Sequence, residues 1–282
     1  MPSLALLGQS LLSGIFVGAL YGLLGLGLSL AWGLLGQINL AHFALAVLGA
    51  YLTYQLAAAG MDPFVTLAVI VPAFFVLGVA LHWLLARFAV SAFNSLLITF
   101  GLTVIIEASI QWIWSADFRR LETHYADVRY RLGAFYIPLP ELLTLVLAAA
   151  LALGLWAALR YTDFGKALRA AAEDPAIAQA FGVNARALAL LLSGLSAALA
   201  GIAGLCIALS YTLAPTQIYA WVGVVFAVVM LGGLGSALGP LVAGIVIGVS
   251  EALTMALTAP SWAPLVSFSL LIALLVLRPE RI

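Results

Sequence analysis

The sequence is poor in charged residues, which make up 8% of its 282 positions, with equal numbers of acidic and basic side chains. A soluble domain carries about 25% charged residues, enough to cover its surface with polar groups. Here 65% of the residues are apolar, so a polar surface of that kind is excluded. The composition indicates an integral membrane protein, and with a net charge of zero we expect no nucleic-acid partner.

Cysteine, lysine and histidine are also scarce. Cys206 is the single cysteine, which excludes an internal disulfide and a cysteine metal cluster and leaves a small, buried apolar role. Lys166 is the single lysine and is followed by alanine, so the chain has no phosphate-binding G-x-x-x-x-G-K-[ST] loop. The three histidines are scattered and no serine stands in a G-x-S-x-G setting, so we expect no metal, no cofactor and no enzyme active site. If ATP drives this protein, another chain has to bind it.

The sequence is rich in long apolar runs, many of them close to the length of about 20 residues that a helix needs to cross a bilayer. These runs lack the strict alternation of a barrel strand, so the backbone must satisfy its hydrogen bonds within helices. We predict an all-α, polytopic helical bundle that forms one transmembrane domain over residues 1–282. Nine spans fit the pattern, and a total of eight or ten would also agree with it. They cover residues 11–33, 39–59, 63–86, 94–114, 138–160, 187–211, 217–234, 238–258 and 262–278.

Two polar segments interrupt the apolar runs, at about residues 115–137 and 161–186. Each carries four basic residues when Arg160, directly before the second segment, is counted with it. The charge of the two segments alone therefore does not show which one is cytoplasmic. One span separates the segments and places them on opposite sides of the membrane. By the order of the spans, Arg87, Arg278 and Arg281 lie on the same side of the membrane as the second segment. That side then has seven basic residues, and the side of the first segment has four. The positive-inside rule makes 161–186 cytoplasmic and 115–137 extracytoplasmic, with the N-terminus outside and the C-terminus inside.

Two glycine-rich stretches resemble each other. A shift of 199 residues aligns residues 33–49 with residues 232–248 and pairs six identical residues. Transporters often contain internal repeats, but a sequence rich in Gly, Ala and Leu also matches itself by chance, so both interpretations stay open. The glycines of 232–248 favour close packing of helices, with a hinge as the alternative.

The most polar run in the second half of the chain is RAAAEDPAIAQAFGVN, residues 169–184. Pro175 fits the first turn of a short helix that the preceding Asp174 caps, and glycine follows where a helix end favours it. Ile177 and Phe181 are four residues apart and share one face of this helix. A solvated connector between spans is one interpretation, and a helix that docks on another protein is the other.

The run FGKALRAAAEDPAIAQAFGVN resembles the cytoplasmic loop of the permease subunits of branched-chain amino acid ABC transporters, the LivH type. GLLGQINLAHFALAVLGAYL near the N-terminus and VVMLGGLGSALGPLVAGIVIGVSEAL near the C-terminus agree with the same family, so the resemblance covers nearly the whole chain. It implies that the loop is similar to the EAA motif of ABC importers, a coupling helix seated in a cleft of the ATP-binding subunit. The residues expected in this coupling loop are Gly165, Lys166, Arg169, Ala172, Glu173, Asp174, Ala178, Phe181, Gly182 and Asn184.

The sequence departs from the family pattern at two places. The family usually reads N-x-A-H-G-E, whereas residues 39–44 read NLAHFA and lack both the glycine and the acid. Because of this difference, the resemblance does not establish an ordinary branched-chain amino acid as the solute. The usual ending R-P-x-G-[LI] is replaced by RPERI at residues 278–282, which only shortens a cytosolic tail.

Polar side chains inside apolar spans are candidates for a translocation path, because an unpaired polar group there costs several kcal/mol. In GQINLAH, Asn39 either caps a helix or lines the path, and His42 either bonds a backbone carbonyl or lines the path. Glu107 and Glu251 lie at some depth in their spans, where a carboxylate requires a partner, water or protonation. Two roles are expected for each, in the path or between helices, and the alternative is an interfacial position that the side chain reaches by snorkelling. The candidate path residues are Gln37, Asn39, His42, Glu107, Ser236 and Glu251.

We therefore predict a permease subunit of a bacterial ABC importer, in the inner membrane, that takes up an amino acid or a related small polar solute. The resemblance implies four kinds of partner: two cytosolic ATP-binding subunits, a second homologous permease that makes a heterodimer, an extracytoplasmic solute-binding protein and the small-molecule substrate. One alternative is a proton-coupled secondary carrier in which Glu107 and Glu251 relay protons. Another is an ABC permease for a different solute such as urea or an amide. A membrane enzyme ranks last, because the sequence shows no cluster of catalytic groups.

Overall fold

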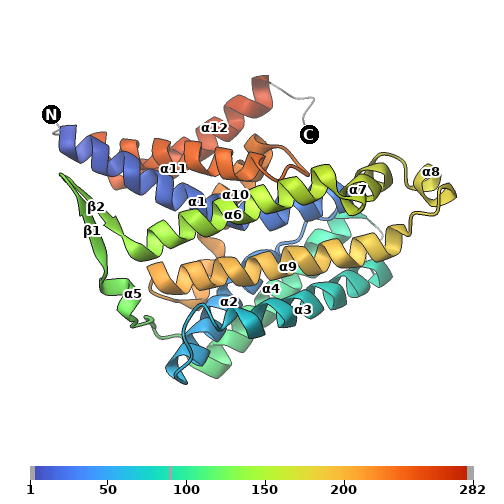
Figure 1. The fold of residues 1–282 in the computed structure, drawn as a ribbon, viewed down its shortest axis with the longest axis horizontal. Coiled ribbons are helices and arrows are strands. Elements are labelled where there is room, and N and C mark those ends of the chain that lie inside the picture. The colour runs from blue at the N-terminus through green and yellow to red at the C-terminus, as the bar shows by residue number, and fades with distance from the viewer. Residues whose placement is uncertain (1–3, 89–90, 278–282) are drawn as a thin grey trace.

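The computed structural model describes residues 4–88 and 91–277 and consists mainly of long helices that run side by side (Figure 1). Within these residues, eight helical segments are long and apolar enough to cross a membrane, which confirms a polytopic bundle of the predicted size. The predicted span 217–234 corresponds to a 3-10 turn and a short helix that together make one crossing, Pro215–Gly232. Arg278, Arg281 and the RPERI ending lie outside the described residues.

The long helices follow the predicted spans to within a few residues, except that the first begins earlier, at Leu4. The ninth predicted span appears as a helix of 15 residues after a 3-10 turn. In chain order the elements are α1 (Leu4–Leu35), α2 (Ala41–Ala58), α3 (Leu67–Phe88), α4 (Ala92–Trp114), α5 (His124–Asp127), β1 (Arg129–Leu132), β2 (Phe135–Pro138), α6 (Leu139–Tyr161), α7 (Asp163–Glu173), α8 (Pro175–Ala180), α9 (Ala185–Ser210), η1 (Pro215–Tyr219), α10 (Val222–Gly232), α11 (Gly239–Leu257), η2 (Pro260–Trp262) and α12 (Ala263–Leu277).

The two polar segments lie at opposite ends of the bundle, as predicted. Figure 1 shows the β1–β2 hairpin and the N-terminus at one end, here called the hairpin end, and α7 and α8 at the other, here called the α7–α8 end. The N-terminal part of α1 is bound to the hairpin, because Gln9 Nε2 donates to the Tyr136 carbonyl at 3.0 Å and Tyr136 N donates to Gln9 Oε1 at 2.9 Å. The N-terminal end of α1 and the segment 115–137 therefore share one side of the membrane.

The hairpin is an element that the sequence analysis did not predict. β1 and β2 are antiparallel, and the pairs run from Arg129 with Pro138 to Leu132 with Phe135. Gly133, in the two-residue turn, has φ of 64°, a left-handed conformation that suits glycine. The predicted all-α architecture holds for the membrane-spanning part, with this small sheet added outside it.

Glycines bring α1 and α11 into close contact. A Cβ atom at Gly18 would collide with the Gly244 carbonyl oxygen, and one at Gly244 would collide with the Gly18 carbonyl oxygen. Gly14 and Gly248 meet in the same way, nearer the hairpin end. Small residues let two backbones approach at such an interface, so the packing role predicted for the glycines of 232–248 is confirmed for Gly244 and Gly248.

We expect Gly244→Ala to lower the stability of the bundle by about 1–3 kcal/mol, because the added methyl group cannot enter without separating α1 from α11. Thermal unfolding of the purified chain in detergent measures the effect. Gly154→Ala is the matched control, because a Cβ at Gly154 meets nothing within 4 Å. Equal unfolding temperatures for the two variants would contradict this account of the interface.

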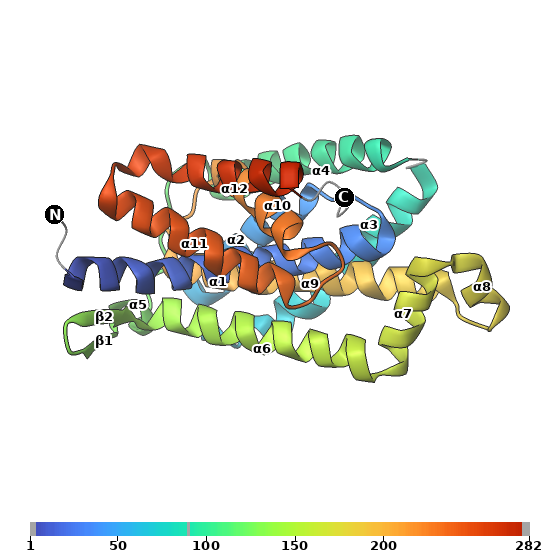
Figure 2. The same ribbon diagram turned by 90° about the horizontal axis from the view of Figure 1, so that it is seen from above.

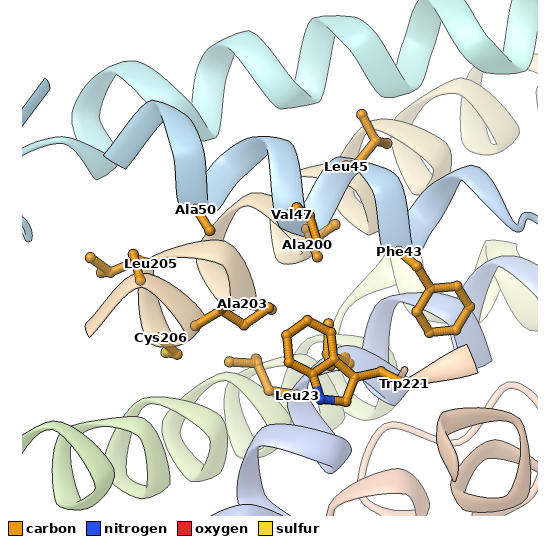
Figure 3. Packing of buried hydrophobic residues seen from close by; sticks show 14 of the residues in the cluster. Leu23, Phe43, Leu45, Val47, Ala50, Ala200, Ala203, Leu205, Cys206 and Trp221 are labelled. Atoms are coloured by element: carbon orange, nitrogen blue, oxygen red, sulfur yellow. The ribbon is translucent and has the colours of Figure 1, made fainter. Parts of the chain in front are cut away.

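The largest apolar core lies where α2 and α9 pack together beside α1. Figure 3 shows Val47 of α2 beside Ala200 of α9, with Leu23 of α1 and Trp221, which precedes α10, beneath them. Cys206 belongs to this core and is 2% exposed, which confirms its predicted role as a small buried apolar residue. Alanine and glycine dominate α9 here, so its backbone lies close to α2.

At the hairpin end, the turn between α2 and α3 is tied to α5. The Asp62 carboxylate accepts hydrogen bonds from the backbone N–H of Phe64 at 2.8 Å and from the Tyr125 hydroxyl at 2.7 Å. The rings of Phe64 and Tyr125 also meet edge to face, with centroids 5.4 Å apart. The Tyr125 hydrogen bond is the main reason that the pKa of Asp62 lies below its usual range.

This tether should depend on pH. A lowered pKa means that the charged Asp62 stabilises the folded contact above the ordinary aspartate pKa of about 3.9, and that this stabilisation is lost as pH falls through the lower, folded value. We expect the amide protection of residues 123–127 against hydrogen exchange, corrected for intrinsic rates, to be constant from pH 7 to pH 5 and to fall in acid below that. Tyr125→Phe should lower the protection already at pH 7 and reduce its pH dependence. An unchanged profile in the variant would rule the tether out.

Candidate coupling loop and translocation path

The loop between α6 and α9 starts with a sharp turn into α7. Thr162 caps α7, and its Oγ1 accepts from the backbone N–H of Gly165 at 3.2 Å. Gly165 is buried, and a Cβ atom there would collide with the backbone of Leu159 in α6. Glycine therefore allows α7 to fold back against the end of α6, while Leu168 is buried on the same side of α7.

A second short helix, α8, forms the tip of the loop, as predicted. Asp174 Oδ1 accepts from the backbone N–H groups of Ala176 at 2.9 Å and Ile177 at 3.0 Å, so Asp174 is its N-cap. Gly182 follows the helix with φ of 87°, a conformation that the missing Cβ permits. Asn184 Oδ1 then accepts from Ala187 N at 3.0 Å and caps α9. Both short helices and the Asp174 cap are confirmed.

The predicted loop residues divide into an exposed set and a buried set. Gly165 and Ala178 are buried, with Ala178 only 4% exposed, so these two cannot touch another chain and instead hold the loop together. Ile177 is 58% exposed and Phe181 is 86% exposed, an unusual state for large apolar side chains in a loop outside the apolar spans. The other predicted residues are all exposed: Lys166, Arg169, Ala172, Glu173, Asp174, Gly182 and Asn184.

Some of the charged residues on the loop pair with each other. Lys166 Nζ lies 3.0 Å from Asp163 Oδ1, the one ion pair among the residues that the structure describes. Both side chains are largely exposed, and surface pairs of this kind contribute little to stability. Arg169 and Glu173 are four residues apart on the exposed side of α7.

The predicted path residues near the α7–α8 end lie in the non-helical segment 36–40 and the start of α2. Hydroxyl groups of α4 satisfy the backbone of this segment: Ser95 Oγ donates to the Ile38 carbonyl at 3.1 Å, and Leu40 N donates to Thr99 Oγ1 at 3.1 Å. The segment is therefore fixed against α4.

Of the structural roles considered for Asn39 and His42, the one for Asn39 is wrong and the one for His42 is confirmed. The N-cap of α2 is Leu40 and no side chain caps it, so the capping role considered for Asn39 is wrong. Asn39 Oδ1 is buried and has no hydrogen-bond partner among the described residues. The His42 ring is 1% exposed and its Nε2 lies 3.0 Å from the Leu24 carbonyl oxygen, which confirms the backbone hydrogen bond considered for it.

Gln37 and Asn39 border a small pocket of about 10 Å³, close to the size that holds one water molecule, which apolar side chains also line. His82 of α3 and Ser193 of α9 also border it, and Ser193 Oγ lies 3.1 Å from His82 Nδ1. Polar groups of α3, α9 and the segment 36–40 therefore meet at this place.

Glu251 lies between three helices. Its carboxylate accepts from the Tyr21 hydroxyl of α1 at 3.2 Å and from the Ser267 hydroxyl of α12, while Glu251 itself belongs to α11 and is buried. The position is that of an interhelical contact, one of the two roles expected for this residue.

Glu107 lies in a different place, on a partly exposed side of α4. The Tyr219 hydroxyl of η1 donates to Glu107 Oε2 at 2.7 Å, and Gln111 Nε2 lies 3.4 Å from Glu107 Oε1. The two carboxylates therefore belong to separate regions of the bundle, and in residues 4–88 and 91–277 neither forms a hydrogen bond with Gln37, Asn39 or His42.

Ser236 lies in the turn between α10 and α11, which is anchored on α1. Ser29 Oγ donates to the Gly233 carbonyl at 3.1 Å, and Gly235 N donates to the Ser29 carbonyl at 2.9 Å. The Ser236 hydroxyl accepts from Gly239 N at 2.9 Å at the first residue of α11. Gly33 and Gly235 touch, so the two stretches that resemble each other in sequence also meet in space.

Residues 10–275 match the model of a family described as the permease component of branched-chain amino acid transport systems. The chain belongs to this permease family. As a member, it is a transport component and a multi-pass membrane protein, which confirms the resemblance seen in the sequence.

Two named relatives of this permease are similar over almost their full length, and a third over less than half of its length. The high-affinity branched-chain amino acid transport system permease protein LivH of Salmonella typhimurium is 27% identical, covering 97% of this chain and 94% of the relative. The BraD protein of Pseudomonas aeruginosa, with the same description, is 25% identical over 100% of this chain and 97% of the relative. A probable LivH of Methanocaldococcus jannaschii is 32% identical over 47% of this chain. No solved structure matches.

The sequence analysis of this permease missed the partners of both carboxylates. Tyr219 and Ser267 stand in apolar surroundings, and hydroxyls alone gave no reason to connect them with residues far away in the chain. The sequence did offer a signal for Gln111, which follows Glu107 by four residues and therefore neighbours it on α4.

Proposed function

We propose that this chain is the permease subunit of an inner-membrane ABC importer for branched-chain or related amino acids. One observation carries the proposal: a loop of capped helices at the α7–α8 end presents Ile177 and Phe181 to the outside, on a chain that has no nucleotide-binding loop of its own. An exposed apolar pair on a capped helix is suited to fill a cleft in another protein. In this proposal that protein is a cytosolic ATP-binding subunit, so the α7–α8 end is cytoplasmic.

Movement of the ATP-binding subunits reaches the bundle through two contacts. Gly165 presses α7 on Leu159 of α6, and the cap at Asn184 joins the loop directly to α9. α9 in turn packs on α1, α2 and α3. Force applied to Phe181 therefore displaces α6 and α9 relative to the rest of the bundle, which switches a path between outward and inward access.

The remaining partners follow from the importer architecture. Two ATP-binding subunits, a second homologous permease in a heterodimer and an extracytoplasmic binding protein that docks at the hairpin end complete the assembly. An amino acid is proposed as the solute because the LivH and BraD relatives are branched-chain amino acid transport permeases by name. No bond is made or broken in this chain.

Uptake into proteoliposomes tests the proposal. The chain, its second permease and the ATP-binding subunits are reconstituted, and labelled leucine is presented with the binding protein. We expect uptake only when ATP is enclosed in the vesicle lumen, on the side of the ATP-binding subunits, and we expect no uptake when a pH gradient is the only driving force. Uptake by this chain alone, driven by a pH gradient without ATP, would replace the importer with the secondary carrier.

A further inference from the structure

A line of polar residues runs along α4. Ser95, Thr99, Thr103, Glu107 and Gln111 are each four residues apart, so they follow one ridge that turns slowly around the helix. The ridge extends from the segment 36–40 toward the hairpin end. It is the longest run of regularly spaced polar side chains in the apolar spans of this sequence.

The two halves of the ridge have different surroundings. Ser95, Thr99 and Thr103 are buried, and both threonine hydroxyls donate to the carbonyl four residues earlier, at 2.8 Å. These hydroxyls have internal partners and need nothing further. Glu107 and Gln111 turn out to the surface of α4, where they are partly or fully exposed.

Glu107 lacks a cationic partner. Its carboxylate accepts only from the Tyr219 hydroxyl and, at longer distance, from Gln111, and no Lys, Arg or His forms an ion pair with it in the described part of the chain. Seven residues separate it from the end of α4, a rise of about 10 Å along the helix. A carboxylate at this depth is too costly to face lipid, so this side of α4 faces water, a cation or another protein chain.

The opposite side of α4 differs. Ile105 is 60% exposed. It lies two residues before Glu107, which corresponds to a rotation of about 200° around the helix axis, so the two side chains point to nearly opposite sides. Ile105 suits a lipid-facing position, and Glu107 does not. The lipid-facing and water-facing sides of α4 are therefore distinguishable at a single depth.

Tyr219 places a second element beside Glu107. It ends η1, the 3-10 turn with which the crossing Pro215–Gly232 begins, directly before the turn at 220–221 that leads into α10. Figure 2 shows α4 and α12 on one flank of the bundle with α10 between them, and α6 on the opposite flank. η1 contacts α4 directly. The start of this crossing and the carboxylate therefore lie on one flank.

We propose that Glu107 and Tyr219 form a water-accessible station that binds the ammonium group of the transported amino acid near the hairpin-end mouth of the path. The proposal rests on the importer function above. An ammonium group has three N–H donors and no acceptor, and a carboxylate with a phenol oxygen beside it supplies acceptors for them. A single charge, partly exposed to water, holds such a group weakly enough to release it, which transport requires.

Accessibility to reagents tests the station in membranes. In a Cys206→Ala background, Glu107→Cys and Ile105→Cys are compared with a charged, membrane-impermeant thiosulfonate and a membrane-permeant maleimide. We expect the Glu107→Cys thiol to react at least 10-fold faster with the charged reagent than the Ile105→Cys thiol, while both react with the maleimide. Equal and slow reaction of both thiols with the charged reagent would overturn the proposal.

Transport tests the role of the charge. In the reconstituted importer, Glu107→Gln should lower leucine uptake at least 10-fold without loss of the ATP-binding subunits, Tyr219→Phe should lower it less, and Glu107→Asp should restore part of it. Ser109→Ala is the control, because its hydroxyl is exposed on the same helix and bonds only the Ile105 carbonyl. Full uptake by the Glu107→Gln variant would contradict the ammonium-binding station but not the proposed importer function. Failure of the wild-type assembly to import leucine with ATP would overturn both.

Discussion

Replacing Phe181 with aspartate is expected to release the ATP-binding subunits from the permease. Phe181 is 86% exposed at the tip of α8, and burying a phenylalanine in a partner contributes about 1.5–3 kcal/mol. The substitution removes that contribution and places a charge in an apolar interface, so we expect the affinity to fall at least 100-fold, or by about 2.7 kcal/mol. Co-purification of the detergent-extracted complex measures it.

Gln179→Asp is the matched control for this prediction. It adds the same charge to the same short helix, two residues from both Ile177 and Phe181 and on the other side. This variant should retain the ATP-binding subunits. Ala178→Trp is a poor probe, because Ala178 is buried and its enlargement disturbs the loop itself. Loss of the complex in both aspartate variants, or in neither, would contradict a docking face made of Ile177 and Phe181.

Glu251→Leu is expected to destabilise the bundle severely, whereas Glu251→Gln keeps it folded. The leucine leaves the Tyr21 and Ser267 hydroxyls without their acceptor between α1, α11 and α12. Each buried polar group left unpaired costs about 1–3 kcal/mol, so the combined loss is large. Glutamine retains an acceptor oxygen of similar reach. Thermal unfolding in detergent measures both variants.

The same pair of variants separates two roles of Glu251. If Glu251 only joins helices, Glu251→Gln transports leucine at a rate near that of the wild type. If Glu251 relays protons, as the secondary carrier requires, glutamine abolishes transport although the protein remains folded, because an amide cannot carry the proton. We expect the first result, since the carboxylate is enclosed by hydroxyls of two neighbouring helices.

Much of the fold follows from local properties of the sequence. Apolar length places the spans, and the capping chemistry of Asp174 and Gly182 defines α8 almost to the residue. The close contact of Gly244 with Gly18 agrees with the small residues that membrane helices use for packing. Such features depend on neighbours in the chain or on the bilayer, both of which the sequence reveals.

The candidate path was harder to predict, because it depends on contacts between distant segments. Glu107 and Glu251 look equivalent in the sequence, yet one lies on the surface of α4 and the other between α1, α11 and α12. Ala178 looked suited to a docking face, and its burial follows from the way α8 folds against its neighbours. The hairpin β1–β2 was missed because its alternation covers only four residues in each strand.

The central claim is that the α7–α8 loop couples this permease to an ATP-binding subunit. The most direct measurement is cross-linking from Phe181→Cys in a Cys206→Ala background, with Tyr130→Cys on β1 as the control at the hairpin end. The account predicts that a short bifunctional reagent joins the Phe181→Cys variant to the ATP-binding subunit, that ATP changes the yield, and that the Tyr130→Cys variant gives no such product. Absence of the product from Phe181→Cys in an assembled, transporting complex would contradict the account.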